Sequence, residues 1–196
     1  VESMARRLLD ETRFLSDREI AENLLEGGDF RPYREVVAGS VVSAAARQGI
    51  ALSDDEAMSV GASVGCWPPF ADTAAALAVL GRGRRLAIVS NVERRDVVSS
   101  IGRIGVAFDE VVTAEDVRAY KPDRTPFDEV LRRLALPREK VLHVAQSLYH
   151  DIGPVATLGI DSIWIDRRGD AATDSPTYRR CFSDLAGMAE ALGPAD

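Results

Sequence analysis

Four polar side chains follow an apolar run in the segment "VLHVAQSLYHD", residues 141–151. The run begins as a buried strand would, and Gln146, Ser147, His150 and Asp151 come directly after it. Amide, hydroxyl, imidazole and carboxylate groups at one strand end can bind an anion, move a proton and orient a cation. Capping of the next helix is an equally good explanation of His150. The sequence therefore predicts a polar site at this strand end without fixing its chemistry.

Two more polar stretches follow apolar strand patterns. Ser90 and Asn91 come after "RLAIVS", and Lys121 lies in "AYKPD", shortly after "FDEVVT". Each has an ordinary explanation, because Ser and Asn often cap helices and a Lys before Pro is usually solvated. Parallel strands, however, bring their carboxyl ends to one edge of a sheet, where ligands bind. Ser and Asn beside a helix N-terminus form an anion site, and a nearby Lys keeps a carboxylate ionised.

Strand patterns and helix patterns alternate along the second part of the chain, and these elements position the polar residues. Such alternation predicts right-handed crossovers and a doubly wound parallel sheet. Ser183 is the expected cap of the last helix, and residues 167–180 form the longest expected loop. Strands are expected at residues 85–90, 108–113, 141–146 and 161–166, and helices at 71–80, 93–105, 125–136, 151–159 and 182–192.

Helical patterns fill the chain up to about residue 66. Ser16 with Glu19, and Ser53 with Glu56, have the spacing of capping boxes. The segment "CWPPF" then interrupts the pattern, because two prolines prevent a helix from continuing. The expected division is a helical domain over residues 1–70 and an α/β domain over residues 71–196.

Composition limits the partners and the compartment. The 196 residues carry a net charge of −7, which argues against nucleic acid or an anionic membrane surface as the main partner. No apolar run approaches the ~20 residues that a membrane span needs. The two cysteines are far apart and form no disulfide framework. A cytoplasmic protein is the expectation.

The stretches "IVSN", "AYKPD" and "HVAQSLYHDIGPVATLGI" together resemble motifs II, III and IV of the haloacid dehalogenase superfamily. The resemblance covers nearly the whole chain, and the sequences of the motifs are most similar to those of type II 2-haloacid dehalogenases. It implies a Rossmann-like doubly wound parallel sheet with an α-helical cap, the role expected of residues 1–70. It also suggests a homodimer.

The resemblance also implies roles for individual residues. In that family an Asp on the first strand attacks the substrate carbon, and water then hydrolyses the ester. By position, Ser90 and Asn91 hold the substrate carboxylate or the nucleophile, with Gln146 and His150 also against the substrate. Lys121 orients the nucleophilic carboxylate. Ser147 and Asp151 order the polar network around Lys121. These are the expected catalytic residues (Lys121, Ser147, Asp151) and substrate-binding residues (Ser90, Asn91, Gln146, His150).

Gln146 indicates whether the site is suited to binding a metal ion. The phosphatase branch of the superfamily carries an Asp at the corresponding position, where it helps to bind Mg²⁺, an ion that prefers anionic oxygen ligands. A neutral amide removes one of these charges, so no cofactor is expected. The alternative is that Gln146 only caps the following helix and that Asp151 supports a weak metal site.

One family motif is absent. The first strand, which ends in the nucleophilic Asp, has no counterpart in the sequence, and "VES" at residues 1–3 resembles what would follow it. Three functions remain open. The first is a metal-independent 2-haloacid dehalogenase-type hydrolase of a small anionic substrate. The second is a Mg²⁺-dependent phosphatase of a small metabolite. The third is a binding or repurposed protein that has lost the nucleophile.

Overall fold

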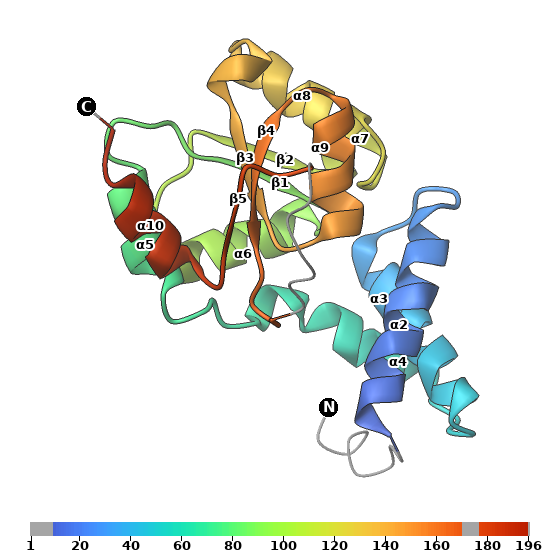
Figure 1. Ribbon diagram of the computed structural model, residues 1–196. Coiled ribbons are helices and arrows are strands. Elements are labelled where there is room, and N and C mark those ends of the chain that lie inside the picture. The colour runs from blue at the N-terminus through green and yellow to red at the C-terminus, as the bar shows by residue number, and fades with distance from the viewer. Residues whose placement is uncertain (1–9, 170–176, 196) are drawn as a thin grey trace.

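The computed structural model describes residues 10–169 and 177–195, and it has two lobes (Figure 1). We call the first the helical lobe. It consists of α2 (Glu11–Glu26), α3 (Tyr33–Arg47) and α4 (Asp54–Ala62), which pack on one another. Its core includes Phe14, Val37, Val41, Ala44, Ala45 and Val64.

The second lobe is α/β. Its strands are β1 (Ala87–Ser90), β2 (Glu110–Thr113), β3 (Leu142–Ala145), β4 (Asp161–Ile165) and β5 (Arg180–Phe182). Its helices are α5 (Thr73–Leu80), α6 (Arg94–Ile104), α7 (Ala114–Val117), α8 (Thr125–Leu134), η2 (Arg138–Lys140), η3 (Leu148–Ile152), α9 (Gly153–Thr157) and α10 (Leu185–Leu192). The short η1 (Val64–Cys66) lies between the lobes and contacts both α4 and α6.

All strand pairs in the described residues are parallel, which confirms the predicted fold class. β1 pairs with β2, while β3, β4 and β5 form a second ladder in that order. Helices α5 and α10 pack together with β4 on one side of the lobe, and α8 and α9 lie on the other (Figure 1). No ladder between described residues joins β1 to β3.

Burial differs between the strands of these two ladders. Residues 162–165 of β4 are all buried, and so are Val112 and Thr113 in β2. In β1 and β3, by contrast, no residue is buried, and Leu142 is 42% exposed. Strands of a parallel sheet are normally covered on both faces and both edges. β5, at the outer end of its ladder, likewise has no buried residue. β1 and β3, the strands that flank the break in the sheet, are therefore covered no better than an edge strand.

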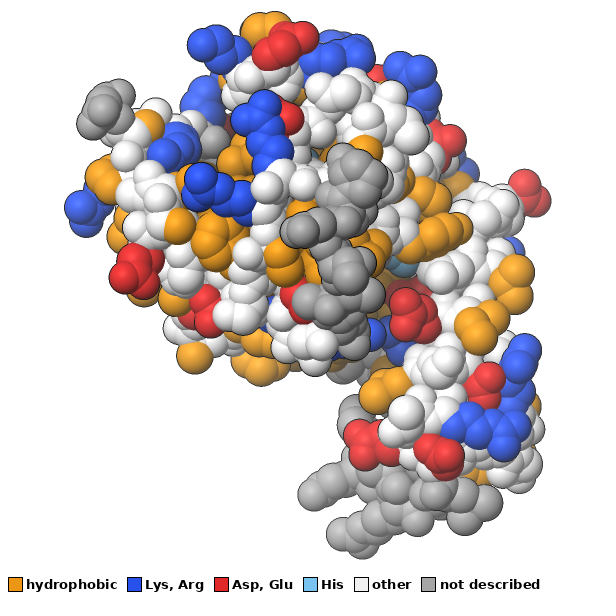
Figure 2. Space-filling model, viewed as in Figure 1, with side chains coloured by type: hydrophobic (Ala, Val, Ile, Leu, Met, Phe, Trp, Pro, Cys, Tyr) orange, Lys and Arg blue, Asp and Glu red, His pale blue; other side chains and the backbone are white. Residues whose placement is uncertain are grey.

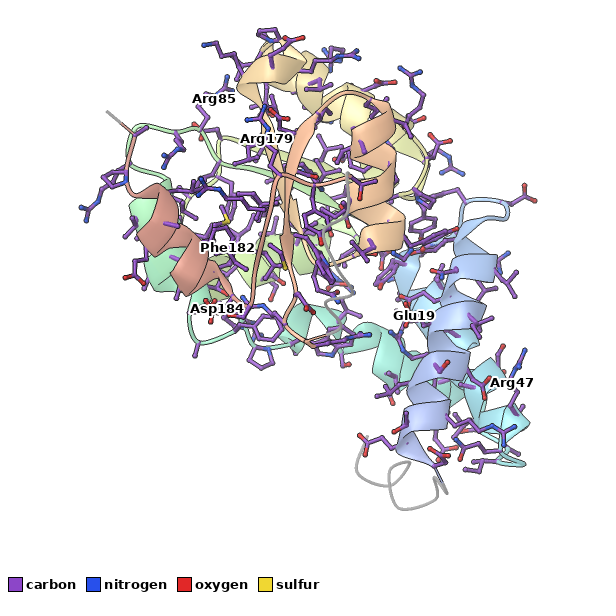
Figure 3. All side chains as sticks on the ribbon, in the orientation of Figure 1. Glu19, Arg47, Arg85, Arg179, Phe182 and Asp184 are labelled. Carbon is purple, nitrogen blue, oxygen red and sulfur yellow. The ribbon has the colours of Figure 1, made fainter. Side chains whose placement is uncertain are left out.

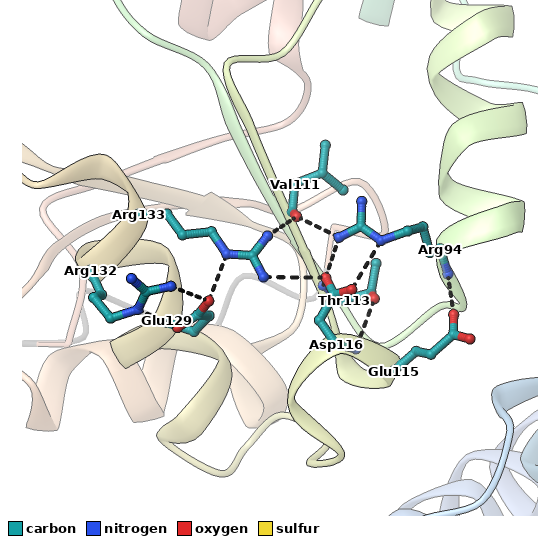
Figure 4. A network of polar contacts seen from close by, with 8 residues as sticks. All are labelled: Arg94, Val111, Thr113, Glu115, Asp116, Glu129, Arg132 and Arg133. Carbon is teal, nitrogen blue, oxygen red and sulfur yellow. Dashed lines mark hydrogen bonds and ion pairs between the residues drawn. The ribbon is translucent and has the colours of Figure 1, made fainter.

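The outer edge of β2 is protected differently. The carbonyl oxygen of Val111 accepts hydrogen bonds from the guanidinium groups of Arg94 (3.1 Å) and Arg133 (2.9 Å). Asp116 pairs with both arginines (Figure 4). These charged side chains come from helices α6, α7 and α8 and cover the edge strand, which discourages its pairing with another chain.

Several local predictions need correction. The Ser53–Glu56 capping box is confirmed. The Ser16–Glu19 box is wrong, because α2 already begins at Glu11 with Asp10 as its cap, and Glu19 lies exposed along that helix (Figure 3).

At the C-terminal end, the predicted cap Ser183 is wrong. The carboxylate of its neighbour Asp184 accepts from Gly187 N at 2.8 Å, and Asp184 lies at the start of α10 (Figure 3). The short strand β5 was missed, since Arg180 was assigned to a loop and Phe182 to a helix. Part of that predicted loop lies outside the described residues. The helix predicted to begin at Asp151 is preceded by a π-helical turn, η3.

The described surface is mixed in charge. Figure 2 shows Lys, Arg, Asp and Glu side chains distributed over the visible face of both lobes. Within residues 10–169 and 177–195, no helix combines the length and the apolar character needed to cross a membrane.

A close approach between helices gives a test of the helical lobe. A Cβ at Gly61 in α4 would lie 2.2 Å from the carbonyl oxygen of Arg34 in α3. Gly61→Ala is therefore expected to destabilise the protein by about 1–3 kcal/mol through overpacking. Gly102→Ala in α6, where nothing lies within 4 Å of the new Cβ, is expected to stabilise it by about 0.5–1 kcal/mol. Urea midpoints of the two variants should move in opposite directions, and an unchanged midpoint for Gly61→Ala would contradict the observed packing.

Candidate active site

Lys121 lies between the carboxyl ends of β1 and β3. Its residue is 9% exposed, and its ammonium group donates to Asp151 Oδ1 at 2.8 Å and to the Val89 carbonyl oxygen at 3.0 Å. Val89 belongs to β1, and Asp151 lies in the turn after β3. One buried cation therefore bridges the two strand ends that flank the break in the sheet.

Asp151 is a buried carboxylate held in its ionised form. Burial by itself raises its pKa, but the hydrogen bond from His143 and the charge of Lys121 outweigh that effect and lower the pKa to about 2. His143 Nε2 lies 2.9 Å from Asp151 Oδ1, and its ring packs edge-on against Phe127. His143 thus packs against the buried Phe127 and also contacts Asp151.

Asn91 fixes the backbone of Lys121. Its Oδ1 accepts from Lys121 N at 2.8 Å, and its Nδ2 donates to Lys121 O at 3.1 Å. The neighbouring Ser90 Oγ accepts from Val92 N at 3.1 Å and still has its own proton to donate. The turn after β1 therefore holds the lysine in register and presents a hydroxyl at the same edge of the sheet.

A second chain of contacts starts after β3. Ser147 Oγ lies 3.1 Å from His150 Nδ1 and accepts from His150 N at 3.0 Å. His150 Nε2 lies 2.8 Å from Glu26 Oε2, and Glu26 is the last residue of α2 in the helical lobe. The other oxygen of Glu26 accepts from Asn91 Nδ2 at 2.9 Å. Glu26 thereby joins the turns after β1 and β3.

The seven predicted site residues do not all meet. Asn91, Lys121 and Asp151 form one connected set, and Ser147 and His150 join it through Glu26. Gln146 is exposed, and its carbonyl oxygen accepts from Trp164 Nε1 at 2.9 Å. Ser90 follows the same strand end, with its hydroxyl turned to Val92.

Glu26 is the participant that the sequence did not reveal. It ends a charged helical stretch, where a glutamate is normally solvated. Its long-range partners Asn91 and His150 lie far from it in the sequence, so no local spacing could have identified it.

An apolar cavity adjoins the site. Its volume is about 350 Å³, and Ser90 lines one wall beside Trp67, Phe70, Ile88 and Ile104. Neither Lys121 nor Asp151 lines it, so the cavity lies beside the polar set. Trp67 and Phe70 lie in the segment that links the two lobes. Tyr33 donates to Glu22 within the helical lobe and packs against Tyr120 of the α/β lobe.

The site offers few of the oxygen ligands that a hard cation such as Mg²⁺ needs. Within the described residues, no group of three or more His, Cys, Asp or Glu side chains is placed to share a metal ion. Oδ1 of Asp151 already accepts from Lys121 and His143, and Gln146, directly after β3, is exposed and carries a neutral amide. The residues present fit a divalent metal poorly, because such ions favour several anionic oxygens. The arrangement suits the binding of an anion or the orientation of a further carboxylate near Lys121.

Comparison with known proteins is consistent with this geometry. The (S)-2-haloacid dehalogenase of Pseudomonas putida is 29% identical over 126 residues, covering 63% of this chain and 55% of that protein. A glyceraldehyde 3-phosphate phosphatase of Methanothermobacter thermautotrophicus is 32% identical over 101 residues, covering 50% of this chain and 45% of that protein. The chain thus spans about half the length of these curated relatives.

The fold has solved counterparts. The L-2-haloacid dehalogenase PA0810 superposes with a TM-score of 0.75 at 21% identity, over 97% of this chain and 88% of that one. A family model described as haloacid dehalogenase-like hydrolase matches residues 64–165, more than half of the chain. With the parallel α/β lobe and the Lys121–Asp151 pair at its strand ends, this match shows that the chain belongs to the haloacid dehalogenase-like hydrolase family.

Proposed function

We propose that the protein is a metal-independent hydrolase of the 2-haloacid dehalogenase type, acting on a small carboxylate substrate. The observation that carries the proposal is Lys121, a buried cation held between the carboxyl ends of β1 and β3. The dehalogenase relatives support the same chemistry. In this scheme residues 71–196 form the catalytic core, and residues 1–70 form a cap over it.

The nucleophile in this scheme is a carboxylate on a strand between β1 and β3, supplied by a segment outside residues 10–169 and 177–195. The incomplete burial of β1 and β3 supports such a position, as does the lack of a ladder between them among the described residues. A carboxylate at the end of that strand would arrive beside Lys121, whose charge keeps it ionised. Asp151 itself is a poor nucleophile, because one of its oxygens already bonds to Lys121 and His143.

The chemistry balances without a metal. The carboxylate oxygen attacks the carbon that bears the halogen, and the halide leaves with the bonding electron pair. Water then hydrolyses the resulting ester, which restores the carboxylate and releases a hydroxy acid. Ser90 and Asn91 stand at the strand end where the substrate carboxylate would bind, and the apolar cavity beside Ser90 would exclude water from the carbon chain.

A phosphatase is the second candidate, favoured by the phosphatase relative and by the retained Asp151. Chloride release from 2-chloropropionate against phosphate release from glyceraldehyde 3-phosphate separates the two. We expect chloride release. Phosphate release that requires Mg²⁺ would make the phosphatase the better proposal. If neither chloride nor phosphate is released, a binding or repurposed protein is favoured.

The missing charge at Gln146 gives a metal test. Activity is expected to survive EDTA, and Gln146→Asp is expected to raise Mg²⁺ affinity by about tenfold or more, because it adds a carboxylate to the same turn after β3 that carries Asp151. Gln146→Asn has nearly the same shape as Asp without the charge and serves as the matched control. Isothermal titration with Mg²⁺ measures the difference. Equal Mg²⁺ affinity in the two variants, or activity lost with EDTA and restored by Mg²⁺ in the unmodified protein, would contradict the proposal.

We also propose a cellular compartment and an assembly state for the protein. We place the protein in the cytoplasm, with a small anionic molecule rather than nucleic acid or membrane as its partner. A homodimer is the assembly that the family resemblance suggests. Cys66 and Cys181 are both free and exposed, as expected for a reducing compartment.

A further inference from the structure

Glu26 is a buried carboxylate that the proposed chemistry does not use. It is the last residue of α2, its side chain is 3% exposed, and its two oxygens contact different partners in the α/β lobe. Oε1 accepts from Asn91 Nδ2 at 2.9 Å, and Oε2 lies 2.8 Å from His150 Nε2. Asn91 donates an N–H to Oε1, and an ionised carboxylate at 2.8 Å favours the His150 tautomer that carries its proton on Nε2, so that each oxygen accepts one hydrogen bond.

This position is costly for a carboxylate. The C-terminal end of a helix carries partial negative charge, which repels an anion. Removal from water penalises the charge further, and the side chain that contacts Oε2 is a histidine rather than a Lys or an Arg. A glutamate at this point contributes little to stability for its cost. What it does provide is two acceptors at fixed positions.

Those acceptors hold the two halves of the site. Asn91 clasps the backbone of Lys121 through N–H and C=O, and its remaining amide hydrogen goes to Glu26. His150 bonds to Ser147 through Nδ1 and to Glu26 through Nε2. The turns after β1 and β3 are therefore both fastened to one side chain of the helical lobe.

We propose that Glu26 is a positioning residue through which the helical lobe fixes Asn91 and His150, so that the orientation of both depends on the lobe being seated against the strand ends. The proposal extends the proposed function, but its structural part holds whatever the reaction is. It predicts that a neutral amide cannot replace the carboxylate without breaking one of the two hydrogen bonds or forcing His150 into its other tautomer. Glutamine has one acceptor oxygen and one donor group, and it faces two donors.

The matched experiment compares Glu26→Gln with Glu22→Gln. Glu22 lies one turn earlier on α2, its side chain is 10% exposed, and its partners Arg18 and Tyr33 both belong to the helical lobe. The chain has two histidines, so the imidazole signals in a ¹⁵N-edited NMR spectrum are few and are assigned with His143→Gln. In the unmodified protein, Nε2 of His150 should carry a proton, because it faces a carboxylate oxygen.

In Glu26→Gln, the ¹⁵N signals of His150 should change as it loses its acceptor or changes tautomer, while those of His143 stay in place. In Glu22→Gln, both sets should match the unmodified protein. With chloride release as the assay, kcat/KM should fall roughly ten- to hundredfold in Glu26→Gln alone. Unchanged His150 signals in Glu26→Gln would overturn the proposal. Absence of chloride release in every protein would count against the proposed function and leave the NMR comparison decisive for Glu26.

Discussion

Replacing Lys121 with Met is expected to reduce chloride release from 2-chloropropionate by about 10²–10³-fold, with most of the loss in kcat. Methionine keeps the length and apolar stem of the side chain but removes the charge that orients and ionises the attacking carboxylate. A single preorganised electrostatic donor typically contributes an effect of about this size. Lys121 is buried between Val89 and Asp151, so a cation from solvent is not expected to replace the lost charge.

The chain offers a clean control for this experiment. It contains two lysines, and the second, Lys140, is exposed in η2. Lys140→Met should therefore leave the rate unchanged. Circular dichroism and unfolding curves of Lys121→Met establish that the folded protein is being assayed. A folded Lys121→Met protein with nearly full activity would remove Lys121 from the site and with it the main support for the proposed function.

Asp151→Asn is expected to destabilise the folded protein by about 3–5 kcal/mol at neutral pH, because it leaves Lys121 buried without its counter-ion. The pKa of Asp151 is about 2 in the folded protein, below the ~3.9 expected when unfolded. A lowered pKa stabilises the fold above the unfolded value, and that contribution disappears as the pH falls toward the folded value.

The difference in unfolding free energy between the unmodified protein and Asp151→Asn should therefore be constant above about pH 5 and shrink between about pH 4 and pH 2. Urea denaturation at several pH values measures it. Asp128→Asn is the control, since Asp128 forms an exposed pair with Arg124 and should cost less than about 1 kcal/mol. A difference that stays constant down to pH 3 would show that Asp151 is not stabilised as an anion.

The α/β alternation was readable from the sequence because buried parallel strands are short apolar runs and their helices carry clear boundaries. Polar residues after those runs, such as Asn91, Lys121 and Asp151, could be placed at one sheet edge by topology alone. β5 was missed because it has three residues, of which Phe182 packs against the core, and so short a segment shows no recognisable hydrophobic pattern. Ser16 shows the limit of a spacing rule, since it matches a capping box yet lies within α2.

Contacts between the lobes were beyond the reach of sequence patterns. Glu26 and Asn91 are 65 positions apart, and Glu26 and His150 are 124 apart. Such pairs depend on how the helical lobe sits against the strand ends. The absent first motif had pointed to a break in the sheet, and the strand pairing of the described residues places that break between β1 and β3.

A carboxylate that reacts with substrate beside Lys121 is the centre of the proposed mechanism, and trapping the product of that reaction tests the mechanism most directly. The product of the natural gene, with whatever sequence flanks residues 1–196, is mixed with 2-chloropropionate in the presence of EDTA, quenched in acid, digested and analysed by mass spectrometry. We predict a substrate-derived ester on an Asp or Glu of a strand segment outside residues 10–169 and 177–195. An ester on Asp151, an adduct on Ser147, or chloride release that stops when EDTA is added would contradict it.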